Sequence, residues 1–177
     1  AGMWRRGGAR EARSTVEEVL KGPDDTPGGR TARYAMAAMP DRYAMERGEW
    51  REATQLKVQP TKWPFVDAIT HSARAIGAAR SGDVAAAEKD AAELTRLHKA
   101  LQDAKDNYWA TEVEIKRLAV GGWIALAQGN ADNAVKLMRA AADLEDKNEK
   151  RIVTTFRIVP ASKMLGDIRL ERKQQQL

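Results

Sequence analysis

One unit recurs along this chain: a helical stretch, a turn made of glycine and a polar residue, and an alanine near the start of another helical stretch. The three clearest copies are centred on Gly48, Gly82 and Gly129, and the alanines that follow them are Ala53, Ala87 and Ala134. Recurrence of a helix–turn–helix unit is typical of repeat architectures. The sequence therefore predicts an all-α protein built from stacked helical hairpins.

Composition agrees with this prediction and excludes several classes of protein. The 177 residues are enough to bury a core without a disulfide or a metal. Cysteine is absent, so disulfides, cysteine-based zinc sites and thiol catalysis are excluded. No apolar run approaches the roughly 20 residues that cross a bilayer, so we expect a soluble protein without a membrane segment. The compartment stays open, since cytoplasmic and exported proteins can both lack cysteine.

The net charge of +5 is concentrated at the C-terminal end, where eight basic residues from position 147 onward accompany three acidic ones. Two interpretations are open. This end could contact an acidic partner or nucleic acid, or it could be a solvated last helix with cations near the negative end of its dipole. The second interpretation is favoured. Nucleic acid is not the expected partner, because this end holds a single aromatic residue, Phe156.

Apolar periodicity predicts helices over residues 9–21, 31–39, 41–47, 49–56, 65–80, 84–103, 105–128, 131–145 and 160–173. The glycine- and proline-rich residues 22–29 are predicted to form a loop, and Pro40 to kink or restart its helix. Residues 151–159 have strand-like composition, but no second strand is available to pair with them. We therefore expect an extended connector there, within a single domain that spans residues 1–177.

The hairpins resemble the 34-residue tetratricopeptide repeat (TPR), whose pattern has small residues at its eighth and twentieth positions and glycine near its fifteenth. One unit matches with Gly122, Gly129 and Ala134, a second with Ala75, Gly82 and Ala87, and a third with Gly48 and Ala53. Gly48 and Gly82 are 34 residues apart, which is the family period. Small residues are needed there because helices cross closely only where the side chain is small. In the third unit, Asp41 occupies the small eighth position, which is a departure from the pattern.

Residues 35–170 also resemble a more specific group, a widespread set of bacterial TPR proteins. The resemblance lies in short sequence segments that begin at Met39, Ala68 and Pro160. The resemblance implies a TPR-like superhelix of about three hairpins with partial units at both ends. Gly82 and Gly129 are 47 residues apart, so both helices between them are expected to be elongated and the superhelix irregular. Because the repeats begin and end within a unit, we expect a fragment of a longer protein, or ends that a partner covers.

Residues able to carry chemistry are few. His71 and His98 are 27 residues apart and no cysteine accompanies them, so His71 is expected to pack between helices and His98 to lie at the surface. The chain lacks a nucleophile elbow and a phosphate-binding loop. Glu112 and Glu114 are two residues apart on a helix and point away from each other. The sequence thus predicts no catalytic residue, no metal, no cofactor and no enzymatic activity.

The resemblance implies that the first helix of each hairpin lines a concave groove. The residues that would line it are Ser72, Ile76 and Arg80 in one unit and Lys116, Trp123 and Leu126 in the next. A tryptophan flanked by lysine and arginine suits an extended peptide with acidic or carboxylate character. The alternatives are that Trp123 is buried between hairpins and that the two cations belong to a solvated face.

The leading functional hypothesis is a non-catalytic scaffold that holds a peptide or a protein segment in this groove. It follows from the resemblance and from the missing catalytic residues. One alternative is a regulatory or sensor part of a larger enzyme. Another is a self-assembly module that forms homodimers through its incomplete terminal repeats.

Overall fold

The computed structural model of the protein describes residues 27–148 and 159–175, and all secondary structure within these ranges is helical. The helices are α2 (Pro27–Arg47), α3 (Trp50–Thr54), α4 (Pro64–Arg80), α5 (Val84–Asp103), α6 (Asn107–Ala127), α7 (Ala131–Lys147) and α8 (Ala161–Gln175). The prediction of an all-α protein is confirmed. The helix predicted at 9–21 and most of the connector predicted at 151–159 lie outside the described residues.

Two predictions about the first described helix were wrong. Helix α2 begins at Pro27, so Gly28 and Gly29 belong to its first turn instead of a loop. Proline fits this place because the first amide of a helix has no intrahelical partner. The helix also continues through Pro40 to Arg47, so the separate helices predicted over 31–39 and 41–47 are one helix. A proline inside a helix removes one backbone hydrogen bond, and the remaining turns can continue on either side of it.

The three predicted turns share one backbone geometry. Gly48, Gly82 and Gly129 have φ angles of 69°, 85° and 80°, in the left-handed region that favours glycine. After each glycine, the next amide donates a hydrogen bond to the carbonyl five residues earlier, at 3.0, 2.9 and 2.8 Å in chain order. This arrangement satisfies carbonyls at the end of the preceding helix. The glycines therefore end their helices in the way that the sequence pattern indicated.

A fourth turn of the same kind lies between Gly82 and Gly129, and it joins the long helices α5 and α6. Lys105 has a φ of 56°, and the amide of Asp106 donates to the Leu101 carbonyl at 3.0 Å. The Asp106 side chain then caps α6 by accepting from the Trp109 amide. Lysine thus occupies a position where the other turns have glycine, although a non-glycine residue is less stable there by about 1 kcal/mol.

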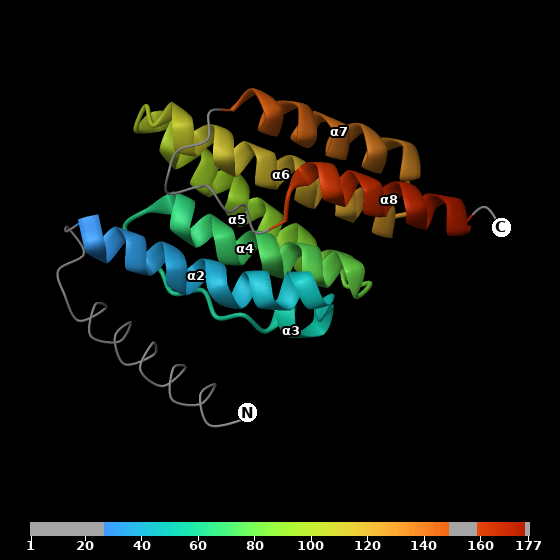
Figure 1. The fold of residues 1–177 in the computed structure, drawn as a ribbon, viewed down its shortest axis with the longest axis horizontal. Helices are drawn as coiled ribbons and strands as arrows, with labels where there is room; N and C mark the ends of the chain where they lie inside the picture. The colour runs from blue at the N-terminus through green and yellow to red at the C-terminus, as the bar shows by residue number, and fades with distance from the viewer. Residues whose placement is uncertain (1–26, 149–158, 176–177) are drawn as a thin grey trace, which may run out of the picture.

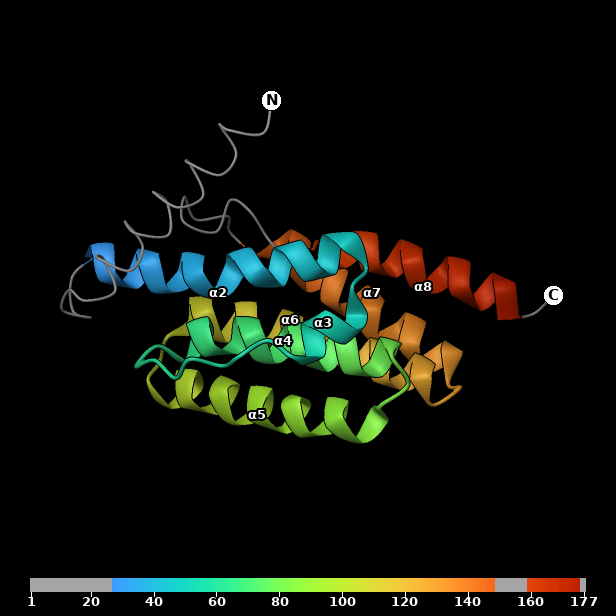
Figure 2. The same ribbon diagram turned by 90° about the horizontal axis from the view of Figure 1, so that it is seen from below.

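Helices α2, α4, α6 and α8 run in one direction and α5 and α7 in the opposite direction (Figure 1). Helix α4 packs against α2, α3, α5 and α6, whereas α6 packs against α4, α5, α7 and α8. Figure 2 shows α4 and α6 between α5 on one side and α2 and α8 on the other. The core fills this central region and includes the fully buried Leu94, Val113 and Val120. None of the described helices has the length and apolar character that a membrane span requires.

Small residues lie where helices approach one another most closely. A Cβ atom on Gly122 would lie 3.2 Å from the Ala134 carbonyl oxygen and 3.2 Å from Met138 Cε, at the junction of α6 and α7. A Cβ on Gly77 would meet the Trp50 carbonyl oxygen at 2.6 Å, at the junction of α3 and α4. The predicted small residues Ala53, Ala87 and Ala134 are fully buried. Larger side chains at these junctions would force the helices apart.

Candidate functional site

The six residues predicted to line a groove do not form an open strip. Ile76, Trp123 and Leu126 are buried, and Trp123 is only 3% exposed. Ser72, Arg80 and Lys116 are half-buried. The alternative interpretation, that Trp123 is buried between helices, describes its position in the structure. Helix α8 packs on α6 and α7, and its Glu171 pairs with Arg80, whose guanidinium lies over the Trp123 ring.

Three of these six residues nevertheless meet. Ser72 and Ile76 from α4 and Lys116 from α6 line one cavity of about 50 Å³, together with Met45 from α2 and Val159, which precedes α8. A water molecule occupies about 30 Å³ in the liquid, so this cavity has room for one or two waters. The structure therefore brings three of the predicted residues together in a space too small for a large peptide side chain.

Arg80, another predicted groove residue, is committed to contacts within the chain. Its Cζ atom lies 4.2 Å from the ring centroid of Trp50 and 4.1 Å from that of Trp123. Its Nη2 atom donates to Glu171 Oε1 at 2.5 Å. A cation between two indole rings is stabilised by the negative ring faces. This stack joins α3, α4, α6 and α8, so the interpretation of Arg80 as part of a solvated face was wrong.

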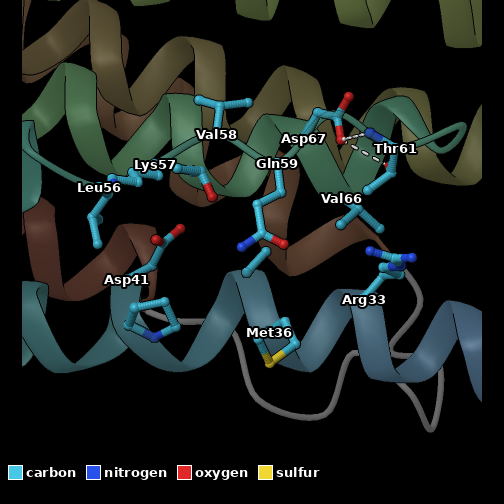
Figure 3. Close-up of a pocket in the computed structure, with 13 residues that line it drawn as sticks. Arg33, Met36, Asp41, Leu56, Lys57, Val58, Gln59, Thr61, Val66 and Asp67 are labelled. Atoms are coloured by element: carbon cyan, nitrogen blue, oxygen red, sulfur yellow. Dashed lines mark hydrogen bonds between the residues drawn. The ribbon is translucent and has the colours of Figure 1, made fainter. Parts of the chain in front are cut away.

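A larger cavity lies at the edge of the molecule, between α2, the segment that follows α3 and the beginning of α4 (Figure 3). Its volume is about 220 Å³. The side chains that line it are both apolar and polar, and they include Met36, Leu56, Gln59, Val66 and Thr70. This cavity has enough room for a small ligand or for one side chain of another molecule.

Asp41 closes one end of this cavity, and we call the space the Asp41 cavity. Its residue exposure is 0%, and neither of its carboxylate oxygens accepts a hydrogen bond from any described residue. Figure 3 shows the side chain projecting from α2 toward the segment that precedes α4. Burial raises the pKa of Asp41 to about 7, and the nearby Lys116 ammonium opposes this shift. The carboxyl group thus titrates near neutrality.

The other buried carboxylates of the described chain each contact at least one hydrogen-bonding group of a neighbouring segment. Asp90 Oδ1 lies 2.7 Å from His71 Nδ1, and Asp90 Oδ2 accepts from Arg74 Nε at 3.0 Å. Glu112 accepts from the Asn148 amide group at 2.7 Å, and Glu145 accepts from the backbone amide of Ala161 at 2.8 Å. Buried polar groups are normally paired in this way. Among these groups, Asp41 is the exception.

The opposite end of the Asp41 cavity holds a different arrangement. Asp67 Oδ1 accepts from the Thr61 amide at 2.9 Å and from the Thr61 hydroxyl at 2.8 Å. Burial raises the pKa of Asp67, and the hydrogen bonds from Thr61 lower it. Figure 3 places Arg33 near this end. Arg33 precedes Asp41 by eight residues of α2, a rise of about 12 Å along the helix. The cation and the unpaired carboxylate are therefore separated.

The two histidines have structural surroundings. His71 pairs with Asp90 between α4 and α5, which agrees with its predicted packing role. His98 was predicted to lie at the surface, and this prediction was wrong, since its side chain is 15% exposed and its Nδ1 lies 3.6 Å from Glu114 Oε2. No group of three or more metal-ligating side chains occurs among the described residues.

The sequence contained one signal for the Asp41 cavity. Asp41 was noted as a departure from a pattern that places a small residue at this point, but no function was assigned to it. The cavity itself could not be anticipated, because its walls come from three separate segments. The chemistry that its Asp41 end offers is recognition of hydrogen-bond donors, above all positively charged ones. Comparisons of the chain with protein-family models, curated proteins and solved structures found no match.

Proposed function

We propose that this protein is a non-catalytic helical scaffold of TPR-like architecture that holds a segment of a partner protein. The partner engages the edge formed by α2 and α4, and one of its side chains enters the Asp41 cavity. This location replaces the predicted strip of Ser72, Ile76, Arg80, Lys116, Trp123 and Leu126, because most of that strip is buried or paired within the chain.

Three features support the TPR-like part of this proposal. From α4 to α8, successive helices alternate in direction and pack against their sequence neighbours. The hairpin turns repeat one left-handed geometry at Gly48, Gly82 and Gly129. A glycine and an alanine, Gly122 and Ala134, form the close contact between α6 and α7. Repeated hairpins of this kind create extended surfaces that commonly bind peptides.

The observation that carries the functional part is the buried, unpaired carboxylate of Asp41 beside a cavity of about 220 Å³. A buried polar group without a partner destabilises the folded chain by about 1–3 kcal/mol. Unpaired buried groups are rare in native proteins, so each one requires an explanation. A ligand group that enters the cavity would supply the missing hydrogen bonds, which is the contribution expected of a recognition site.

A peptide-display experiment on the full chain tests this function. Random-sequence peptides are selected on the unmodified protein and then compared on Ala37→Leu, which fills the cavity from α2, and on Ala140→Leu, which adds the same bulk at an exposed position of α7. We expect selected peptides to bind at least tenfold more weakly to Ala37→Leu and unchanged to Ala140→Leu. Failure to enrich any peptide, or equal binding to both variants, would contradict the proposal.

A second candidate function is self-association through the same edge. Met39 and Tyr43 are 55% and 58% exposed and lie four residues apart on α2, so they form one apolar patch. Light scattering across a concentration series would detect this association, and Tyr43→Glu should abolish it. A monomer at all concentrations would exclude it. The further alternative, a regulatory part of a larger enzyme, stays a prediction.

A further inference from the structure

We propose that the Asp41 cavity binds a guanidinium group, the side-chain cation of an arginine on the partner segment. This inference rests on the proposed function, because it names the chemical group that the scaffold recognises.

The Asp41 end of the cavity requires a donor from outside the described chain. Asp41 is fully buried, and neither of its oxygens has a hydrogen-bond partner among the described residues. At the opposite end, Asp67 already accepts two hydrogen bonds from Thr61. Two acceptor oxygens of one carboxylate match the paired N–H groups of a guanidinium, which can donate two parallel bonds.

None of the cations described near the cavity donates a hydrogen bond to Asp41. Arg33 lies about 12 Å along α2 from Asp41, since eight residues separate them at about 1.5 Å each. Lys57, the other cation that lines the cavity, is exposed. Lys116 is near enough to attract Asp41, but it makes no hydrogen bond with the carboxylate. The guanidinium would therefore meet a carboxylate that still lacks its hydrogen bonds.

Burial favours guanidinium over a primary ammonium group. An ammonium is a compact and strongly hydrated charge, whereas a guanidinium is planar and more weakly hydrated, so it loses less on entering a buried site. The chain satisfies its other buried aspartate in the same way, because Asp90 accepts from Arg74 Nε at 3.0 Å. The volume of about 220 Å³ is also several times that of a water molecule and can admit a long side chain.

The test uses N-butylguanidinium as the probe, with N-butylurea as its neutral isostere and n-butylamine as an ammonium of similar length. Binding to the full chain is measured by calorimetry and by amide chemical-shift changes in NMR spectra. We expect N-butylguanidinium to bind with shifts at cavity residues such as Thr61 and Val66, at least tenfold more tightly than N-butylurea, and more tightly than n-butylamine.

Asp41→Asn is the decisive variant, and Asp143→Asn at an exposed position of α7 is its control. We expect at least a tenfold loss of N-butylguanidinium binding in Asp41→Asn and no change in Asp143→Asn. Ala37→Leu provides a second test that keeps the carboxylate and fills the space beside it, and it should also abolish binding. Unchanged binding in both cavity variants, equal binding of the urea, tighter binding of the amine, or no saturable binding would each overturn the proposal.

The results also separate this inference from the proposed function. If N-butylguanidinium binds through Asp41 but no displayed peptide is retained, the site is correct and the scaffold function is wrong. If selected peptides bind without any preference for arginine and the probe does not bind, the scaffold function stands and the guanidinium assignment fails.

Discussion

Two buried aspartates of this protein have opposite surroundings. Asp90, between α4 and α5, contacts His71 and Arg74, whereas Asp41, on α2 at the edge of the molecule, has no hydrogen bond from any described residue. Both are nearly or fully inaccessible, at 5% and 0% exposure. Burial alone therefore does not decide what an ionisable group contributes. A compensated carboxylate links helices, while an uncompensated one destabilises the fold.

The largest expected effect concerns Asp41 and pH. Its pKa is 3.8 in the unfolded chain and about 7 in the folded protein. The folded protein therefore keeps a proton that the unfolded chain loses, so the free energy of unfolding falls as pH rises from about 4 to about 7. Asp41→Asn removes this dependence. It should stabilise the protein above pH 7 by an amount on the order of 4 kcal/mol, as the size of the shift implies.

Urea unfolding of Asp41→Asn and of the unmodified protein from pH 4 to pH 8 measures this difference. Asp67 on α4 and Lys116 on α6 lie in the same region and also carry charge, but they are common to both proteins and largely cancel in the difference. The exposed Asp143→Asn is the control. If the difference in the free energy of unfolding between the two proteins does not grow with pH, the contrast between the two aspartates is wrong.

The same substitution at Asp90 should act in the opposite direction. Asp90→Asn removes the charge that Arg74 and His71 contact, and hydrogen bonds to charged groups contribute about 1.5–3 kcal/mol each. We expect a loss of about 2 kcal/mol, because the Arg74 side chain is 32% exposed and can regain some hydration. Denaturant unfolding at pH 7 measures it, and stabilisation would show that Asp90 is not compensated.

A smaller effect is expected from Lys116→Met. The Lys116 ammonium lowers the pKa of Asp41 against the larger effect of burial. Removal of this charge should raise the pKa of Asp41 further and move the upper limit of the pH-dependent range of stability upward. A carbon-detected NMR titration of the Asp41 carboxyl reports the change. If the pKa falls instead, Lys116 does not act on Asp41 electrostatically.

Local features of the fold were well predicted. The bounds of α4 and α5 differ from the predicted ones by at most one residue, and Gly48, Gly82 and Gly129 adopt the left-handed turns expected of them. These features depend on residues close in sequence, through capping, helix propensity and backbone freedom. The break between residues 103 and 105 was also predicted, but the left-handed conformation of Lys105 was not, because lysine gives no signal for a positive φ angle.

Candidate site residues were predicted less well, for a physical reason that Arg80 and Asp41 illustrate. Arg80 was assigned to a groove, but its partner Glu171 lies 91 residues further along the chain. No function was predicted for Asp41, although it occupies a repeat position where the pattern has a small residue. The surroundings of a polar side chain depend on how helices from distant parts of the chain pack together. A local sequence pattern does not specify this packing.

The sequence by itself determined that this protein is helical, where most helices end, and that small residues meet at helix junctions. Tertiary structure alone decided which charges are compensated. It placed Arg74 beside Asp90 from a position 16 residues away and left Asp41 without a hydrogen bond, at one end of a cavity bounded by three separate segments. Helix formation is governed by neighbours within a few residues, whereas hydrogen bonding in the interior depends on the packing of whole helices.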